Sequence, residues 1–240
     1  MRGWSVAIII VMTYLIANWK SYSNNTQSLI WLKELGKLAP VISPNLKVII
    51  CLPFTDLPEF NRHLNFSKTP LFVGAQTVSS YSAGKHTGDI TASMLSELVT
   101  YCLVGHSERR SNGETSGDVA QQVLSLLNYN ITPIICLDTP YMDEQIKELF
   151  RQNITLSHCI FAYEPISAIG SGQPESAEDV SRVVSKITLL TNSKSPILYG
   201  GSVSPQNVQD FINQPSISGV LVGTNSLKPS VFCQLIKLLS

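Results

Sequence analysis

The chain has no excess charge of either sign, because 17 lysine and arginine residues balance 17 aspartate and glutamate residues among its 240 residues. A balanced chain creates no overall positive field that would attract nucleic acid or an anionic membrane. The sequence also lacks a Gly/Ser/Pro-rich linker, a low-complexity tract and a run of like charges. We therefore expect a single domain with a small-molecule partner, and neither nucleic acid nor membrane as a partner.

Cysteine is present but lacks the spacing of a metal site or of a disulfide framework. The cysteines are odd in number, widely spaced and without a CxxC pair: Cys51, Cys102, Cys136, Cys159 and Cys233. Zinc sites use closely spaced cysteines, and disulfide-rich secreted domains use even numbers of them. We expect no metal site, and thiols that are small core residues in the reducing cytoplasm.

The start of the chain is apolar but lacks the length of a membrane span. Arg2 followed by the apolar runs Val6–Met12 and Tyr14–Ala17 resembles a signal peptide. A transmembrane helix needs about 20 apolar residues, and cleavage after Ala17 would destroy the strand predicted there. Our hypothesis is that Met12 is the initiator, that residues 1–11 are a non-native extension, and that residues 12–240 form the catalytic domain.

Short runs rich in β-branched residues recur along the chain and predict eight strands. Helical patterns lie between them, clearest at Val180, Val183, Val184, Ile187 and Leu190 and at Leu29, Leu32, Leu35 and Leu38. Ser176 and Asp179 have the spacing of a capping box that opens the first of these helices. The predicted strands are Leu15–Ala17, Val48–Cys51, Leu71–Gly74, Cys102–Val104, Pro133–Cys136, Ile160–Tyr163, Ile197–Tyr199 and Gly219–Val222.

Alternating strands and helices indicate parallel strands, which either close into a barrel or form an open, doubly wound sheet. The nearly uniform spacing of the units favours closure. So does the lack of a Gly-x-Gly-x-x-Gly sequence after the first strand, which an open dinucleotide-binding sheet would carry there. One closed α/β barrel typically needs about 250 residues, close to the length of this chain.

Polar residues follow the predicted strands at the ends where a barrel builds its active site. They are Asn18 and Lys20, Gln76, His106 and Glu108, Glu164, Gly200, Gly201 and Ser202, and Gly223. Each of the charged residues alone has an ordinary explanation, such as a solvated lysine or a carboxylate that caps a helix. Several ionisable groups on one rim indicate function instead, because burying a charged group costs free energy. Such groups are retained where they form ion pairs or take part in catalysis or binding.

The sequence resembles the triosephosphate isomerase family over essentially its whole length and in the right order. The GHSERR stretch at residues 105–110 and the YEP and AIGSG stretches at residues 163–165 and 168–172 are the most specific matches. The others are Ala17-Asn18-Trp19-Lys20, Gly74-Ala75-Gln76, Thr87-Gly88-Asp89 and Tyr199-Gly200-Gly201-Ser202-Val203. The resemblance implies a single closed (β/α)8 TIM barrel.

The resemblance also implies an activity and the roles of five catalytic residues. The family interconverts dihydroxyacetone phosphate and D-glyceraldehyde 3-phosphate in glycolysis and gluconeogenesis, through an enediolate and without a cofactor or metal. Glu164 corresponds to the general base and His106 to a neutral imidazole that donates to the substrate oxygens. Lys20 supplies positive charge, Asn18 a hydrogen-bond donor, and Glu108 orients Lys20.

Phosphate binding, a lid and a dimer are implied in the same way. The phosphate would lie against Asn18, Lys20, Gly170, Ser202, Gly223 and Thr224, where backbone N–H groups can point at it. The lid would comprise Pro165, Ile166, Ser167, Ala168, Ile169, Gly170, Ser171 and Gly172. Thr87, Gly88 and Asp89 belong to a loop that reaches into a neighbouring subunit, so a homodimer is expected.

The sequence departs from the family pattern at several positions. Ser167 stands where the first hinge of the lid usually carries tryptophan, which removes about 1.5–3 kcal/mol of packing. Thr224 replaces the second glycine of the last phosphate turn. Leu137, Asp138 and Thr139 follow Cys136 where the family continues with a glycine and a glutamate, so we expect a rebuilt loop. Thr77 and Asp89 are further exchanges.

Two other functions are compatible with part of this pattern. One is a catalytically weakened homologue that acts as a binding or surface-interaction protein, suggested by Ser167 and Thr224. The other is a phosphate-binding barrel isomerase for a larger sugar phosphate. Intact ionisable residues argue against the first, because a buried base without a task is costly, and a closing lid argues against the second.

The hypothesis about the start of the chain predicts the mass of the natively expressed protein. Translation from Met12 gives a mature chain that lacks residues 1–11, which intact mass spectrometry detects directly. A mature chain that begins at Met1, or at a residue beyond Met12, contradicts the hypothesis.

Overall fold

The computed structural model describes residues 12–67, 69–166, 168 and 172–240. Residues 1–11 lie outside this range, so the expected extension stays a prediction. In the described part, no helix is long and apolar enough to cross a membrane.

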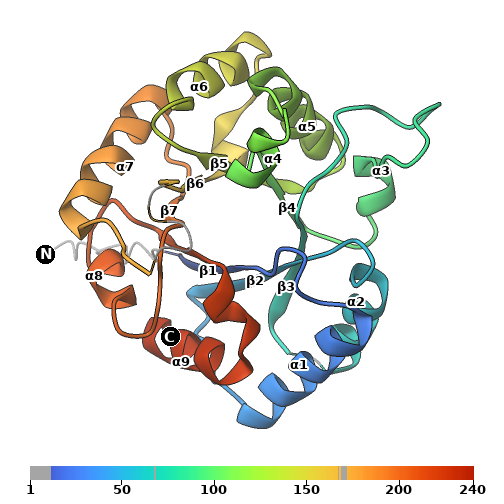
Figure 1. Ribbon diagram of the computed structural model, residues 1–240, viewed down its shortest axis with the longest axis vertical. Helices are drawn as coiled ribbons and strands as arrows, with labels where there is room; N and C mark the ends of the chain where they lie inside the picture. The colour runs from blue at the N-terminus through green and yellow to red at the C-terminus, as the bar shows by residue number, and fades with distance from the viewer. Residues whose placement is uncertain (1–11, 68, 167, 169–171) are drawn as a thin grey trace, which may run out of the picture.

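Eight parallel strands close into one barrel in chain order, from β1 next to β2 around to β8 next to β1 (Figure 1). This confirms closure over the open sheet, and every predicted strand is present. The strands are β1 (Thr13–Asn18), β2 (Leu46–Leu52), β3 (Leu71–Ala75), β4 (Tyr101–Val104), β5 (Thr132–Leu137), β6 (Ile160–Tyr163), β7 (Ile197–Tyr199) and β8 (Gly219–Val222).

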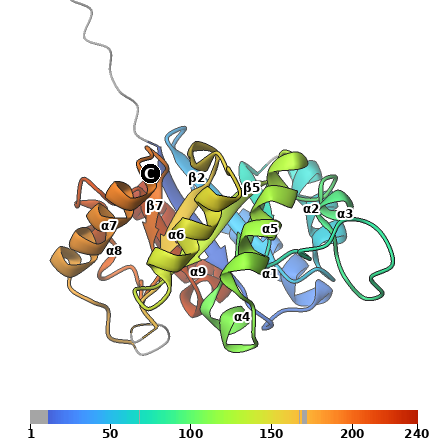
Figure 2. The ribbon, with the colours of Figure 1, turned by 90° about the horizontal axis from the view of Figure 1, so that it is seen from above.

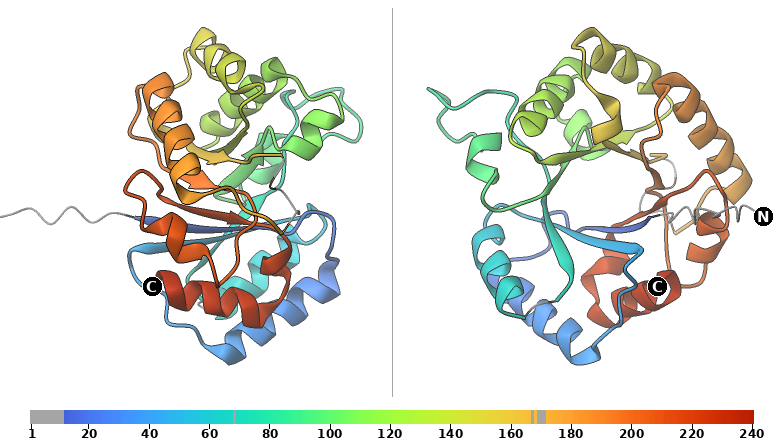
Figure 3. Two further views of the ribbon diagram at one scale, coloured as in Figure 1. Left: turned by 60° about the vertical axis from the view of Figure 1, so that its left-hand side comes forward. Right: turned by 180° about the vertical axis from the view of Figure 1, so that it is seen from behind.

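Helices surround the barrel as an outer ring, as the right-hand view in Figure 3 shows. The longer ones are α1 (Asn25–Leu38), α2 (Leu57–Ser67), α5 (Ser116–Asn128), α6 (Met142–Arg151), α7 (Ala177–Thr191) and α9 (Pro229–Leu239). Short ones lie in the connections: α3 (Ala92–Leu95), α4 (Ser107–Ser111), η1 (Leu156–His158), α8 (Val208–Ile212) and η2 (Thr224–Leu227).

Both faces of the strands are buried, and the face to which a side chain points decides whether it reaches the barrel mouth. Successive side chains of a strand point to opposite faces. In β1, Tyr14 and Ile16 pack in the barrel interior, whereas Leu15 and Ala17 pack in the layer shared with the helices. Asn18 continues the inward series of β1, and Glu164 continues the inward series Ile160, Ala162 of β6. Both polar residues therefore project over the mouth.

Helix phases follow the sequence pattern with one correction. Val180, Val184 and Ile187 of α7 are buried, and the Ser176 hydroxyl caps this helix by accepting the Asp179 N–H at 3.1 Å. In α1, however, the buried stripe is Ser28, Trp31, Leu32 and Leu35, and the Leu38 side chain is 43% exposed. Trp31 takes the inward position because it packs edge-on against Trp19, with ring centroids 4.8 Å apart.

Candidate active site

A cavity of about 320 Å³ opens at the carboxyl ends of the strands. It brings together seven of the predicted catalytic and phosphate-binding residues: Asn18, Lys20, His106, Glu164, Ser202, Gly223 and Thr224. Gly172 also lines it, whereas Glu108 lies beside it and reaches it through Lys20. Gly170 lies outside the described residues.

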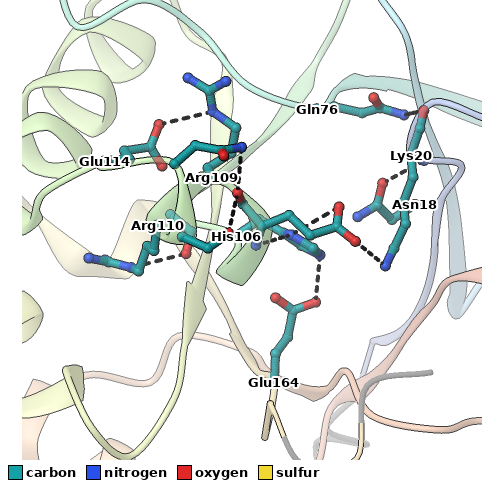
Figure 4. A network of polar contacts seen from close by, with 12 residues as sticks. Asn18, Lys20, Gln76, His106, Arg109, Arg110, Glu114 and Glu164 are labelled. Atoms are coloured by element: carbon teal, nitrogen blue, oxygen red, sulfur yellow. Dashed lines mark hydrogen bonds and ion pairs between the residues drawn. The ribbon is translucent and has the colours of Figure 1, made fainter. Parts of the chain in front are cut away.

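Glu164 is a buried carboxylate at the end of β6. Its side chain is 3% exposed, and its Oε1 lies 3.5 Å from Nε2 of His106 (Figure 4). Its Oε2 is buried and has no hydrogen-bond partner among the described residues. Burial raises the pKa of this carboxyl above its ordinary value, and the neighbouring His106, the Cys136 thiol and the Lys20 ammonium oppose that shift only in part. The result is a proton acceptor that is stronger than an exposed glutamate.

His106 directs one ring nitrogen at the cavity because the other is bound to the backbone. The Glu108 N–H donates to Nδ1 of His106 at 3.2 Å, at the first turn of α4. In the neutral ring, an acceptor at Nδ1 leaves the proton on Nε2. This Nε2–H faces both the cavity and Glu164, so it can donate to an oxygen bound there.

Lys20 has a backbone conformation that is uncommon for a residue with a side chain. Its φ is +50°, in the left-handed region. Two residues hold it there: the Lys20 N–H donates to Oδ1 of Asn18 at 3.0 Å, and Nε2 of Gln76 donates to the Lys20 carbonyl at 2.8 Å. The Gln76 amide also donates to the Cys51 carbonyl at 3.1 Å, so the residue after β3 is tied both to the loop after β1 and to β2.

The Lys20 ammonium is fixed in turn by Glu108, whose Oε1 lies 2.6 Å from Nζ. The Lys20 side chain is 20% exposed and that of Glu108 is 56% exposed. A cation held at the cavity wall favours a negative charge that develops nearby.

Gly200 gives the Glu164 side chain its space. A Cβ added at Gly200 would lie 2.6 Å from Cγ and 3.3 Å from Oε1 of Glu164. Any larger residue at this position therefore displaces the carboxylate. Gly200, directly after β7, thus allows Glu164, directly after β6, to keep its position.

The loops after β7 and β8 form the opposite wall of the cavity. Ser202, Gly223 and Thr224 lie here, and Thr224 opens η2 without a positive φ, so its Cβ adds no backbone strain. Two asparagines that the sequence analysis did not single out hold these loops: Asn225 joins the loop after β8 to the loop after β7, and Asn207 acts within the loop after β7. Asn225 donates to the Val203 carbonyl at 2.6 Å, and Asn207 to the Ser202 carbonyl at 2.9 Å. Neither directly follows a strand, so no positional signal marked them.

The segment predicted as a lid is described in part. Pro165 and Ala168 are buried and Ile166 is exposed, whereas Ser167, Ile169, Gly170 and Ser171 lie outside the described residues. The Ser202 hydroxyl contacts both sides of the segment, because it donates to the Ala168 carbonyl at 2.8 Å and accepts the Gly172 N–H at 3.2 Å. Tyr199 adds a contact beyond it by accepting the Glu175 N–H at 3.2 Å.

Comparison with known proteins gives consistent matches over the barrel. A family model described as triosephosphate isomerase matches residues 13–239. The triosephosphate isomerase of Synechococcus sp. (strain JA-2-3B'a(2-13)) is 38% identical over 240 residues, which cover 92% of this chain and 95% of that protein. That of Picosynechococcus sp. (strain ATCC 27264 / PCC 7002 / PR-6) is 37% identical, with 92% and 97% covered. That of Nostoc sp. (strain PCC 7120 / SAG 25.82 / UTEX 2576) is 35% identical, with 94% and 98% covered.

The environment of Glu164 predicts its titration. In substrate-free protein labelled with ¹³C at the glutamate carboxyl carbon, the Glu164 signal should titrate with a midpoint above the ordinary value of 4.5, because burial disfavours the charged form. Glu164→Gln identifies the signal by removing it. Since only the ionised carboxylate accepts a proton, any reaction that uses it weakens as the pH falls through this raised pKa. A midpoint at or below 4.5 contradicts the proposed effect of burial.

Proposed function

The chain belongs to the triosephosphate isomerase family, and we propose that it interconverts dihydroxyacetone phosphate and D-glyceraldehyde 3-phosphate. The observation that carries this proposal is the buried carboxylate of Glu164 facing the Nε2–H of His106 across one cavity. The reaction moves a proton between adjacent carbons, one of which bears a hydroxyl group and the other a carbonyl group. A base and hydrogen-bond donors to the two oxygens supply this chemistry, so the proposal requires no cofactor or metal.

Glu164 is the proposed general base. It takes a proton from the hydroxyl-bearing carbon to give the enediolate, and returns a proton to the neighbouring carbon. Its burial and raised pKa favour this role, because a base works best when its pKa approaches the working pH.

His106, Lys20 and Asn18 are the proposed partners of the substrate oxygens. The neutral imidazole donates from Nε2 to the oxygen that gains negative charge, and the Lys20 ammonium stabilises that charge. Asn18 accepts the Lys20 N–H through Oδ1. This bond fixes the orientation of the side-chain amide, whose NH₂ group is the proposed donor to the substrate. Donors that are fixed before the reaction need no reorganisation during it.

The phosphate binds, in this proposal, against Lys20 and the loops after β7 and β8. Lys20 lies beside Gly223, where an added Cβ would come 3.8 Å from the lysine Cε. In this proposal the same ammonium serves both the phosphate and the oxygen that gains charge, because it lines the cavity together with Gly223, His106 and Glu164. Gly170 is proposed as a further contact by resemblance alone, and lid closure over the phosphate would exclude water from the enediolate.

The alternative of a weakened homologue used only for binding is not favoured. Asn18, Lys20, His106, Glu108 and Glu164 are all retained, and four of them line one cavity. A binding protein has no need to keep a buried carboxylate at that position.

We also propose a homodimer that assembles through the loop between β3 and α3. Residues 81–89 of this loop are exposed, and the loop extends away from the barrel in Figures 1 and 2. The rings of Tyr81 and His86 stack within this loop, with centroids 4.1 Å apart and an interplanar angle of 3°. Gly88 adopts a φ of +95°, next to Thr87 and Asp89. An exposed, projecting loop with a defined conformation is suited to insertion into a second copy of the chain. There Thr87 would contact and position Asn18 and Lys20 of that copy.

The dimer proposal predicts the effect of one charged substitution. Thr87→Arg places a second cation beside Lys20 of the other copy, so it should shift sedimentation toward the monomer and remove most of the activity. Ser185→Arg on the exposed face of α7 adds the same charge elsewhere and should change neither property. A proven monomer with full activity would refute the proposal.

The activity is tested by turnover of glyceraldehyde 3-phosphate, coupled to a dehydrogenase that consumes dihydroxyacetone phosphate. The protein should come from a host strain without its own isomerase, and Glu164→Gln should be purified in parallel. We expect an active wild type and a fall of about 10² to 10⁴ in kcat for the variant, as for loss of a general base. A folded but inactive wild type would instead support the binding-protein alternative.

A further inference from the structure

Asp138 lies in the loop that departs from the family pattern, directly after β5, and is buried although it is charged. The residue as a whole is only 6% exposed. Both carboxylate oxygens accept backbone N–H groups: Oδ1 accepts that of Thr139 at 2.6 Å, and Oδ2 accepts that of Ile166 at 3.2 Å. The first bond is local, but the second joins the loop after β5 to the loop after β6.

This carboxylate is held by hydrogen bonds rather than by an ion pair. Within the described part of the chain, no lysine, arginine or histidine nitrogen lies within the 4.0 Å that defines an ion pair with it. A buried charge without a cation is costly unless hydrogen bonds satisfy it, and bonds from N–H groups to a carboxylate are about twice as strong as neutral ones. The Ile166 N–H therefore offsets part of the cost of burying Asp138. The same hydrogen bond restrains the position of the Ile166 backbone.

Ile166 is two residues beyond Glu164. The intervening Pro165 is buried and has its φ fixed by its ring. On the other side, the Glu164 N–H donates to the Leu137 carbonyl at 2.8 Å. Consecutive residues 137 and 138 therefore hold the backbone on both sides of the Glu164–Pro165 unit.

We propose that Asp138 is a positioning residue for Glu164. It fixes the backbone after the base, while Leu137 fixes the backbone at the base, and together they aim the carboxylate at the substrate carbon. Asp138 itself touches neither the substrate nor the reacting atoms. The proposal rests on the function proposed above, in which Glu164 is the base.

Kinetics of two variants and one control test the proposal. Asp138→Ala removes both acceptors and should lower kcat on the order of 10-fold to 100-fold, because a misplacement of about 1 Å can cost 10²-fold. The KM should stay within about 3-fold, since Asp138 does not contact the cavity. Asp138→Asn keeps one acceptor oxygen and should lose less kcat than the alanine variant. Asp143→Ala, an exposed carboxylate of α6 that pairs with Lys186, should match the wild type.

Hydrogen exchange supplies a readout that does not depend on activity. The Ile166 side chain is 53% exposed, yet its amide should exchange slowly in substrate-free wild type because Asp138 binds it. Asp138→Ala should accelerate exchange at Ile166 while leaving the amides of β5 and β6 protected. If the alanine variant does not fold, two other measurements test whether Asp138 positions Glu164: exchange at Ile166 in the wild type, and the kcat of Asp138→Asn.

The outcomes separate this proposal from the function on which it rests. An inactive wild type overturns the function, whatever Asp138 does. An active wild type whose Asp138→Ala variant keeps its kcat, or a wild-type Ile166 amide that exchanges as fast as an unstructured one, overturns only the role of Asp138. An equal loss of kcat in Asp138→Ala and Asp143→Ala overturns it as well.

Discussion

Burial of one carboxylate, that of Glu164, is the constraint to which the rest of the site conforms. Taking a charged group out of water is unfavourable, and among the described residues Glu164 has no cation in direct contact to offset the cost. Its Oε1 lies 3.5 Å from the His106 imidazole, and its Oε2 has no hydrogen-bond partner in that part of the chain. The neighbouring strand β7 is followed by Gly200, where a Cβ would collide with the glutamate. The backbone on both sides of Glu164 is bound by the loop after β5. A proton acceptor of raised pKa is thereby held in one place.

Lys20, on the other side of the site, adopts a positive φ, which is unfavourable for a residue with a side chain. The Asn18 side chain and the Gln76 amide hold its backbone, and the Glu108 carboxylate holds its ammonium. Each comes from a different strand end. The lysine is therefore directed by the closure of the barrel as a whole rather than by its own loop, and its ammonium is already oriented when a substrate arrives.

The sequence predicted the barrel because its signals are local and repeated. Eight apolar runs of strand length, separated by helical patterns, indicate parallel strands, and the polar residues that follow them mark the rim. The phase of α1 was predicted less well, because the leucine spacing competed with Trp31, whose inward position depends on Trp19 in the loop after β1. The Asp138–Ile166 bond spans 28 residues, and the tie between Gln76 and Lys20 spans 56. Such contacts exist only once the strands are neighbours, so no pattern along the chain could reveal them.

The central claim is that Glu164 carries a proton between two substrate carbons, and isotope exchange tests it most directly. Glyceraldehyde 3-phosphate is converted by the wild-type protein in D₂O, and the dihydroxyacetone phosphate is examined by ¹H NMR for deuterium at its C1 carbon. The account predicts deuterium at that carbon, because a carboxylic acid exchanges its proton with solvent before returning it. Full retention of the original hydrogen at wild-type rates, unaffected by Glu164→Gln, would indicate direct hydride transfer and contradict the account.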